Sequence, residues 1–401
     1  MNRIHTILIS VCTILALNFN ASAQEKLTAD RELPILAWWS IPEEETTVER
    51  FKELRESGIN ISFSPYSDIE AVEKALDAAQ QAGVKLLPSC PELKAEPEKT
   101  VKQLMKHSAL FGYHLVDEPG AGAFKELGDW VRRIQAVDKQ HPCYINLLPN
   151  WALGMTYTEH VDSFVKEVPV PFLSFDHYPI TVGADGNHVL GPHFYQNLET
   201  IAAASKKSGV PFWAFALTTA HASYPVPTVG EIKLQLYSNL AYGAQGLQYF
   251  TYWTPEQGRD QDFHQGPIGL DWKRTAIYDR IKLVNGEIQN YAGVFLGAKL
   301  VSVCHTGKQR PSGTRYIDKL PEPVKVLETS DGGAIVSVLE KGNRWFLVIV
   351  NRDFRNPMKL TIYTDDAVKK VLTDGTLIPA STYTPVTEVD PGDMAIYTWE
   401  K

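Results

Sequence analysis

Two adjacent carboxylates, Asp117 and Glu118, end an apolar and aromatic run that begins at Leu110. Such side chains suit a strand that is buried on both faces, and Pro119, which has no amide proton, ends its ladder just after Glu118. A carboxyl group at this tip would lie in a partly desolvated mouth, where its pKa can rise toward the range of a general acid. The alternative is that both residues only cap the helix expected to begin near Phe124.

The chain around this run alternates short apolar stretches with amphipathic stretches from Pro34 onward, and the alternation completes eight rounds. Nearly continuous apolar runs are typical of parallel strands, and the stretches between them have helical periodicity. The expected strands span residues 35–41, 59–66, 84–90, 111–118, 143–149, 172–178, 211–218 and 247–253. Eight strand–helix units predict an α/β fold, a (β/α)8 TIM barrel, whose last helix runs from Lys273 to about Tyr291.

After Gly297 the pattern changes to short β-branched and aromatic runs that are broken by Gly, Pro, Asn and Asp. Runs of this kind indicate antiparallel strands joined by tight turns. They are expected at residues 334–339, 344–351, 359–363, 368–372 and 394–399. The sequence therefore predicts a small C-terminal antiparallel β-sandwich, packed closely on the barrel because no flexible linker separates the two.

The N-terminus has the pattern of a secretory signal peptide, with Arg3 before an apolar run at residues 7–17 and the small-residue site Ala21-Ser22-Ala23. The run is too short to span a bilayer, which argues against membrane insertion. The expected division is a signal peptide at 1–23, a catalytic barrel at 24–297 and a sandwich at 298–401. Cleavage would release the protein into the periplasm or the extracellular space.

Charge and residue spacing exclude several classes of partner. A net charge of −8 argues against nucleic acid. The histidines and cysteines show no metal-ligand spacing, and the chain has no glycine-rich phosphate loop, so no metal and no cofactor are expected. Hydrophobic residues make up 44% of the chain, which is enough for one large and one small core.

The expected strand tips carry amides, a histidine and aromatic rings beside the carboxylates. Reactive groups of a TIM barrel lie at the carboxyl ends of its strands, so these side chains would meet on one rim. Amides that bind hydroxyl groups, flat rings that stack and acids that act on a glycosidic oxygen together suit a carbohydrate substrate. The candidate contacts are Trp38, Tyr66, His114, Asn146, His177, Tyr178, Trp213 and Trp253.

Strand parity selects one face of each tip. Ser174, Asp176 and Tyr178 share the face expected to point into the barrel. In the fourth strand Gly112, His114, Val116 and Glu118 share a face, which would place His114 beneath Glu118. His114 is then expected to be a barrel-core histidine with satisfied hydrogen bonds rather than a catalyst.

Three stretches resemble retaining glycoside hydrolases of the large β-glycosidase clan, and family-42 β-galactosidases in particular. Residues 111–119, Phe-Gly-Tyr-His-Leu-Val-Asp-Glu-Pro, look like the acid/base strand of the clan, whose usual tip is Asn-Glu-Pro. Residues 236–250 are similar to the passage from helix seven to strand eight, and residues 174–179 fit the sixth strand. The resemblance implies that Glu118 is the acid/base. The function expected for the chain is that of an exported glycoside hydrolase, β-galactosidase-like, which cleaves a plant or host glycan or oligosaccharide.

The chain departs from that clan at strand seven, where the clan carries a nucleophilic glutamate and residues 215–219 contain no acid. Asp176, Glu231 and Asp117 are the candidates for the second carboxylate, and Asp176 is preferred. An inactive sugar-binding barrel is one alternative. Another is an α-glycosidase that uses Asp117 and Asp176, which resembles α-galactosidase-type barrels.

The spacing of the two carboxyl groups would distinguish the mechanisms. Retaining enzymes need about 5–5.5 Å between them, and inverting enzymes need about 6.5–9.5 Å. The short side chain of Asp176, on a next-but-one strand from Glu118, favours the wider gap and inversion.

Overall fold

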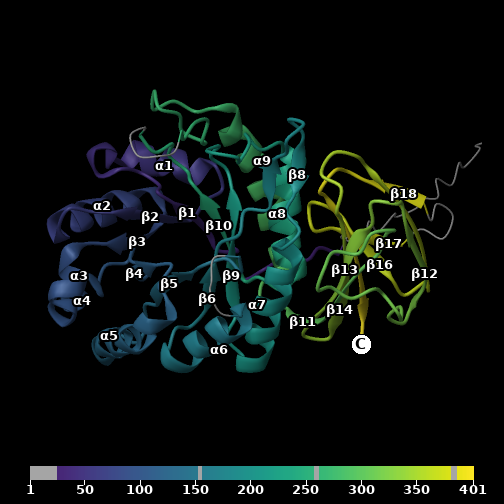
Figure 1. Ribbon diagram of the computed structural model, residues 1–401, viewed down its shortest axis with the longest axis horizontal. Coiled ribbons are helices and arrows are strands. Elements are labelled where there is room, and N and C mark those ends of the chain that lie inside the picture. The colour runs from purple at the N-terminus through teal and green to yellow at the C-terminus, as the bar shows by residue number, and fades with distance from the viewer. Residues whose placement is uncertain (1–24, 152–155, 257–261, 381–385) are drawn as a thin grey trace, which may run out of the picture.

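The computed structural model describes residues 25–151, 156–256, 262–380 and 386–401. The signal-peptide prediction concerns residues outside this part of the chain. In the described residues an α/β barrel is followed by antiparallel sheets, which lie side by side with it in Figure 1. No helix among them is long and apolar enough to cross a membrane.

The barrel is an eight-stranded parallel sheet with the order β3-β2-β1-β10-β9-β6-β5-β4. A single parallel bridge between Leu86 and Leu110 joins its two ends, and the Phe111 amide donates to the Leu86 carbonyl over 2.7 Å. The (β/α)8 prediction is confirmed. The strands are β1 (Ile35–Trp38), β2 (Ile61–Pro65), β3 (Lys85–Ser89), β4 (Tyr113–Asp117), β5 (Cys143–Leu147), β6 (Leu173–Phe175), β9 (Phe212–Leu217) and β10 (Gly246–Phe250).

The sixth strand differs most from its prediction, because β6 has three residues where 172–178 were expected. The Asp176 amide still donates to the Leu147 carbonyl of β5 over 3.4 Å. The chain then enters a hairpin formed by β7 (Ile180–Val182) and β8 (His188–Leu190). Apolar and aromatic periodicity continues to Tyr178, so the pattern cannot show where ladder hydrogen bonds stop.

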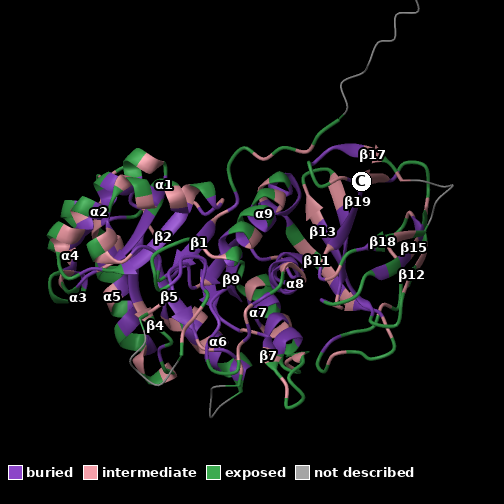
Figure 2. Ribbon diagram, turned by 90° about the horizontal axis from the view of Figure 1, so that it is seen from above, coloured by how far each residue is buried: buried purple, intermediate pink, exposed green. Residues whose placement is uncertain are grey.

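Helices surround the barrel, with their apolar sides toward the strands. They are α1 (Val48–Glu56), α2 (Ile69–Ala82), α3 (Pro91–Ala95), α4 (Pro97–Leu104), α5 (Phe124–Val137), α6 (Tyr157–Glu167), α7 (Phe194–Ser208), α8 (Val229–Ala241), α9 (Ala276–Asn290) and α10 (Ala292–Phe295). Figure 2 shows buried strands inside a layer of helices whose outer faces are exposed.

Two apolar layers form in the barrel. Outward strand residues pack on the helices, whereas inward residues such as Trp38, Phe63, Tyr144 and Phe215 form a separate interior cluster. His114 lies within this interior, with its ring 4.3 Å from that of Phe63. The prediction of a barrel-core histidine therefore agrees with the packing. Its hydrogen bonds are not satisfied as expected, because neither ring nitrogen has a partner among the described residues.

The C-terminal sandwich is confirmed as two antiparallel sheets with apolar side chains of both between them. The larger sheet has β11 (Lys299–His305), β13 (Ala334–Lys341), β14 (Arg344–Asn351), β19 (Met394–Glu400), β16 (Lys369–Val371) and β17 (Leu377–Pro379). The smaller has β12 (Val324–Thr329), β15 (Met358–Thr364) and β18 (Val386–Val389). Four strands, β11, β12, β17 and β18, were not predicted, because they are edge strands or short and half exposed.

Helix α8 lies between the barrel and the larger sheet (Figure 1). From Glu231 to Ala241 each of its residues is buried. The Ser337 hydroxyl of β13 donates to the Ala241 carbonyl over 2.6 Å. Lys233 of α8 donates to Glu287 over 3.0 Å and to Asp393 over 2.6 Å. The close packing expected from the lack of a linker is present.

Candidate active site

The tip of β4 is shaped by a shift in register. His114 pairs with Tyr144 of β5, but the next pair is Val116 with Ile145, so Leu115 is an extra residue. Leu115 and Val116 both pack in the helix layer. The extra residue corrects the predicted shared face, because Val116 points away from the barrel interior and both Asp117 and Glu118 line the mouth.

Glu118 is held in an unusual backbone conformation. Its φ of 48° lies in the left-handed region, which is strained for a residue with a side chain, and its amide donates to the Asn146 carbonyl over 2.9 Å. The capping alternative fails, because α5 begins after Ala123 and has no side-chain cap. Glu118 therefore faces the cavity without serving the helix.

One amide connects the two aspartates at the centre of the site. The Nδ2 atom of Asn146 donates to Asp117 Oδ1 over 3.2 Å and to Asp176 Oδ1 over 2.9 Å. The Ser174 hydroxyl donates to Asn146 Oδ1 over 2.8 Å and accepts from Gln248 Nε2 over 2.9 Å. This partly buried network spans four strands and fixes the positions of both carboxyl groups.

Glu118 and Asp176 are in direct hydrogen-bonding contact. Such a contact leaves no room for the water that lies between the carboxyl groups of an inverting pair. The expectation of a wide gap between these two carboxyl groups was wrong. Asp176 directly follows β6, and its amide donates to the Leu147 carbonyl of β5 over 3.4 Å.

All three carboxyl groups are shifted toward the protonated form. Burial raises the pKa of Asp117 to about 6, and the negative charge of Glu118 adds to this shift. Burial also raises the pKa of Glu118, although the hydrogen bond from Asp176 opposes the change. The pKa of Asp176 lies well above its usual value because of burial and of the charges on Glu118 and Asp117. The cluster can therefore hold and donate a proton near neutral pH.

The carboxyl groups lie in a cavity of about 680 Å³ at the carboxyl ends of the strands. This volume suits one or two sugar rings. Its walls are largely aromatic, and Trp39 and Trp151 are 39% and 63% exposed. The aromatic lining residues are Trp38, Trp39, Trp151, Tyr178, Phe215, Tyr224, Phe250 and Phe263. We call this space the main cavity.

Of the predicted contacts, Trp38, Asn146 and Tyr178 line the main cavity, and Trp253 lines a smaller cavity beside it. His114 lies below the cavity floor between aromatic rings, and burial lowers its pKa to about 3, so it is neutral.

Three predicted contacts lie elsewhere. His177 points to α7, where its Nδ1 is 3.0 Å from Asn197 Oδ1. Trp213 stacks on Phe172 and lines a cavity at the opposite end of the barrel. Tyr66 is buried in the helix layer. Each stands near a strand end or on an aromatic run, but the sequence does not show which way the side chain points.

Glu231 serves a structural role instead of a catalytic one. It belongs to a capping box with Thr228 at the start of α8, and its Oε1 is 2.5 Å from His188 Nδ1. The tip of strand seven is also structural, because the Thr218 hydroxyl donates to the Thr251 carbonyl over 2.7 Å. Neither Glu231 nor Thr218 therefore supplies the carboxylate that is missing at the tip of strand seven.

Sequence reasoning missed Trp39, Trp151 and Glu256, which all line the main cavity. Glu256 follows Pro255 in the loop after β10. Trp39 adjoins the predicted Trp38 and, like Glu118, has a left-handed backbone, with a φ of 40°. Trp39 lies within the expected first strand, 35–41, whereas Glu256 lies three residues beyond the expected eighth strand, 247–253. Among the described residues, no group of three or more His, Cys, Asp or Glu side chains could hold a metal ion.

Comparison with known proteins relates the chain to a family of glycoside hydrolases. Residues 97–291 match the sequence model of glycosyl hydrolase family 42, described as beta-galactosidase. The chain resembles the family-42 β-galactosidases. The matched stretch runs from α4 into the loop after α9, so it includes Asp117, Glu118 and Asp176. No protein of curated function matches the sequence.

Solved structures agree in fold at low sequence identity. A catalytic mutant of Gan42B, a GH42 β-galactosidase from G. stearothermophilus, has 9% identity and a TM-score of 0.62, over 94% of this chain and 100% of that one. A β-galactosidase from Bacillus circulans sp. alkalophilus has 9% identity and a TM-score of 0.63, over 92% and 99%. An Anoxybacillus alpha-amylase, at 8% identity and 0.53, covers 92% and 98%. The family match and the shared barrel together support a glycoside hydrolase that resembles family 42.

Proposed function

We propose that the protein is an exported, β-galactosidase-like glycoside hydrolase that cleaves a plant or host glycan or oligosaccharide. The hydrogen-bonded cluster of Asp117, Glu118 and Asp176 on the floor of an aromatic cavity carries the proposal. A raised carboxyl pKa keeps a proton available for the glycosidic oxygen, and exposed indole rings suit the apolar faces of sugars. The signal-peptide pattern of residues 1–23 supports export.

In this proposal Glu118 is the general acid, because it is open to the cavity and its pKa is raised. Asp176 is the second carboxylate of the pair. It is 9% exposed and donates a hydrogen bond to Glu118, so it holds a proton that passes to Glu118, and Glu118 then delivers that proton to the glycosidic oxygen. Asp117 is also open to the cavity. Its pKa of about 6 leaves it mostly ionised at pH 7, where it can stabilise positive charge on the sugar ring.

The α-glycosidase alternative, with Asp117 and Asp176 as the working pair, is favoured by the Asn146 amide that joins them. The sugar-binding alternative is favoured by the strand-seven tip, whose side chains bind strand eight.

The proposal is tested by the hydrolysis of matched α- and β-configured aryl galactosides. The variants Asp117→Asn and Asp176→Asn are each assayed with and without sodium azide. We expect turnover of the β-galactoside and a loss of about 10²-fold or more in each variant. Azide rescues the variant that lost a nucleophile, and the anomer of the azide product reports the stereochemistry. Preference for the α-galactoside would favour the α-glycosidase, and a folded protein that hydrolyses neither would be a sugar-binding barrel.

A further inference from the structure

A second cavity opens beside the main cavity. Asp117, Glu118 and Asp176 do not line it. Its volume is about 300 Å³, at the lower end of ligand pockets. It lies where the loops after β1, β2 and β10 meet. Trp39, Pro255 and Glu256 line both cavities, so one ligand can extend from one into the other. We call this space the side cavity.

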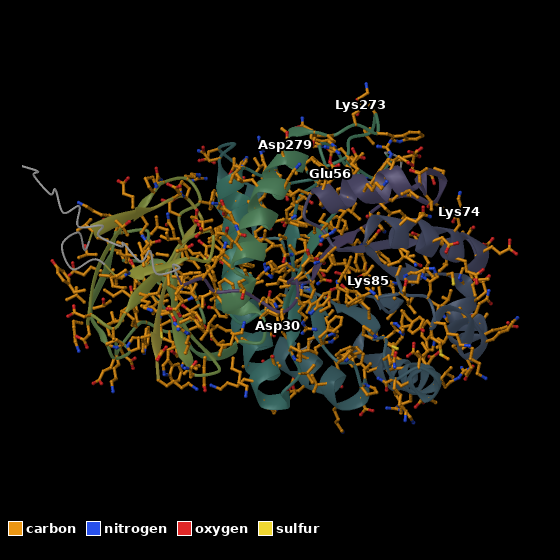
Figure 3. All side chains as sticks on the ribbon, turned by 180° about the vertical axis from the view of Figure 1, so that it is seen from behind. Asp30, Glu56, Lys74, Lys85, Lys273 and Asp279 are labelled. Carbon is orange, nitrogen blue, oxygen red and sulfur yellow. The ribbon has the colours of Figure 1, made fainter. Side chains whose placement is uncertain are left out.

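Two exposed indole rings line the side cavity. Trp39 is 39% exposed and Trp272 is 43% exposed, although large apolar rings are normally covered. Both residues have left-handed backbones, with φ of 40° and 61°. Trp272 lies in the loop between β10 and α9, which projects at the top of Figure 3 where its neighbour Lys273 is labelled. Exposed indoles beside a cavity are suited to stacking on a ring-shaped ligand.

The polar groups of the side cavity point to a hydroxylated ligand. Ser40 is 1% exposed, and its hydroxyl has no hydrogen-bond partner among the described residues. A buried hydroxyl without a partner is unfavourable unless a ligand or water binds it. A second polar group of the side cavity is the carboxylate of Glu43. It accepts from the Ser67 amide over 2.6 Å and from the Ser67 hydroxyl over 2.7 Å. Glu43 is therefore fixed in position and can accept from sugar hydroxyls with its remaining lone pairs.

The charge of both cavities favours a ligand without acidic groups. Six lining residues are Asp or Glu, and no described lining residue is Lys or Arg: Glu43, Glu44, Asp117, Glu118, Asp176 and Glu256. A uronic acid or a sulfated sugar would meet like charges there.

We propose that the side cavity is a second sugar-binding site, which holds the ring next to the one at Glu118 in a neutral oligosaccharide. The inference rests on the proposed function for the identity of the main cavity. Trp39 and Trp272 would contact the faces of the second ring, while Ser40 and Glu43 bind its hydroxyl groups. The substrate would then be at least a disaccharide of neutral sugars.

Calorimetric titration of the full chain tests this site without turnover, on a Glu118→Gln background that leaves the sugars intact. The probes are galactose, digalacturonate and four neutral disaccharides: galactobiose, cellobiose, mannobiose and xylobiose. We expect one neutral disaccharide to bind at least tenfold more tightly than galactose, and digalacturonate to bind weakest. Trp272→Ala should remove most of that tenfold gain while changing the Kd of galactose less than twofold, and Ser40→Ala should weaken the same disaccharide about threefold.

Tyr363→Ala is the matched control, because Tyr363 is an aromatic residue that is 45% exposed on the distant sandwich. It should change neither affinity. Three results would each overturn the proposed second sugar-binding site. They are disaccharide binding that is insensitive to Trp272→Ala and Ser40→Ala, no binding of any neutral disaccharide, and tighter binding of digalacturonate than of the neutral disaccharides. Aryl-galactoside turnover by the parent protein is measured separately, so a binding site without hydrolysis would refute the proposed function and leave this inference standing.

Discussion

At the scale of single residues, the site combines three carboxyl groups whose pKa values all rise with burial. Their roles differ because their access differs. Asp117 and Glu118 are open to the cavity, while Asp176 is buried and touches Glu118. A protonated Asp176 that donates to Glu118 explains how a buried acid can persist there, since its charged form would face two neighbouring negative charges.

The raised pKa of Asp176 predicts a cost in stability above mildly acidic pH. Between the unfolded pKa of about 4 and the higher folded pKa, the folded protein binds more protons than the unfolded chain, so stability falls as pH rises through this window. Asp176→Asn removes that cost. We expect its Tm to exceed that of the parent by roughly 1–3 °C at pH 8 and to match it at pH 4.

Calorimetry of both proteins at pH 4, 6 and 8 measures this difference. The exposed Asp30, labelled in Figure 3, provides the control Asp30→Asn, which should follow the parent at each pH. A Tm for Asp176→Asn that drops below the parent as pH rises would show that the ionised carboxylate stabilises the fold.

At the scale of elements, the sequence predicted what periodicity can encode and missed what backbone geometry decides. The eight strands and the inward position of Ser174 and Asp176 follow from apolar runs and parity. The extra residue Leu115 in β4 breaks that parity, and no residue type marks it, so the shared orientation of Asp117 and Glu118 could not be predicted. The directions of side chains at strand ends, such as those of His177 and Trp213, also depend on where the hydrogen-bonded ladder of each strand begins and ends. The sequence does not show those positions.

Helix α8 provides a test at this scale, since its Lys233 joins Glu287 of α9 to Asp393 of the sandwich. Lys233 is 7% exposed. Lys233→Met would leave two partly buried carboxylates without their cation, and we expect a loss of about 3–5 kcal/mol in the free energy of unfolding. Urea denaturation measures it.

Lys74→Met is the control, because Lys74 projects from α2 into solvent (Figure 3) and should cost less than about 0.5 kcal/mol. Equal effects of the two substitutions would mean that the buried Lys233 contacts contribute nothing beyond a surface charge.

At the scale of the whole molecule, the barrel and the sandwich share one apolar core. Residues of β13, β14 and β19 pack in the same cluster as the barrel helices, and α8 is buried between them. An interface of this kind makes independent folding of the barrel unfavourable, since separation would expose apolar side chains of α8 to water.

We therefore expect the full chain to unfold in a single transition, and a chain ending at Gly297 to aggregate or to melt at least 10 °C lower. Differential scanning calorimetry and light scattering measure these outcomes. A truncated barrel that is monomeric and melts with the full chain would contradict the shared core.

The central claim, that Glu118 is the proton donor of a glycoside hydrolase, is tested most directly by the leaving-group dependence of Glu118→Gln. A general acid is needed when the departing oxygen is basic and is dispensable when it is an activated phenol. We expect kcat/KM to fall about 10²–10⁴-fold for a disaccharide and less than about tenfold for a dinitrophenyl glycoside, with Tm unchanged. Equal losses on both substrates, or none on the disaccharide, would contradict the assignment.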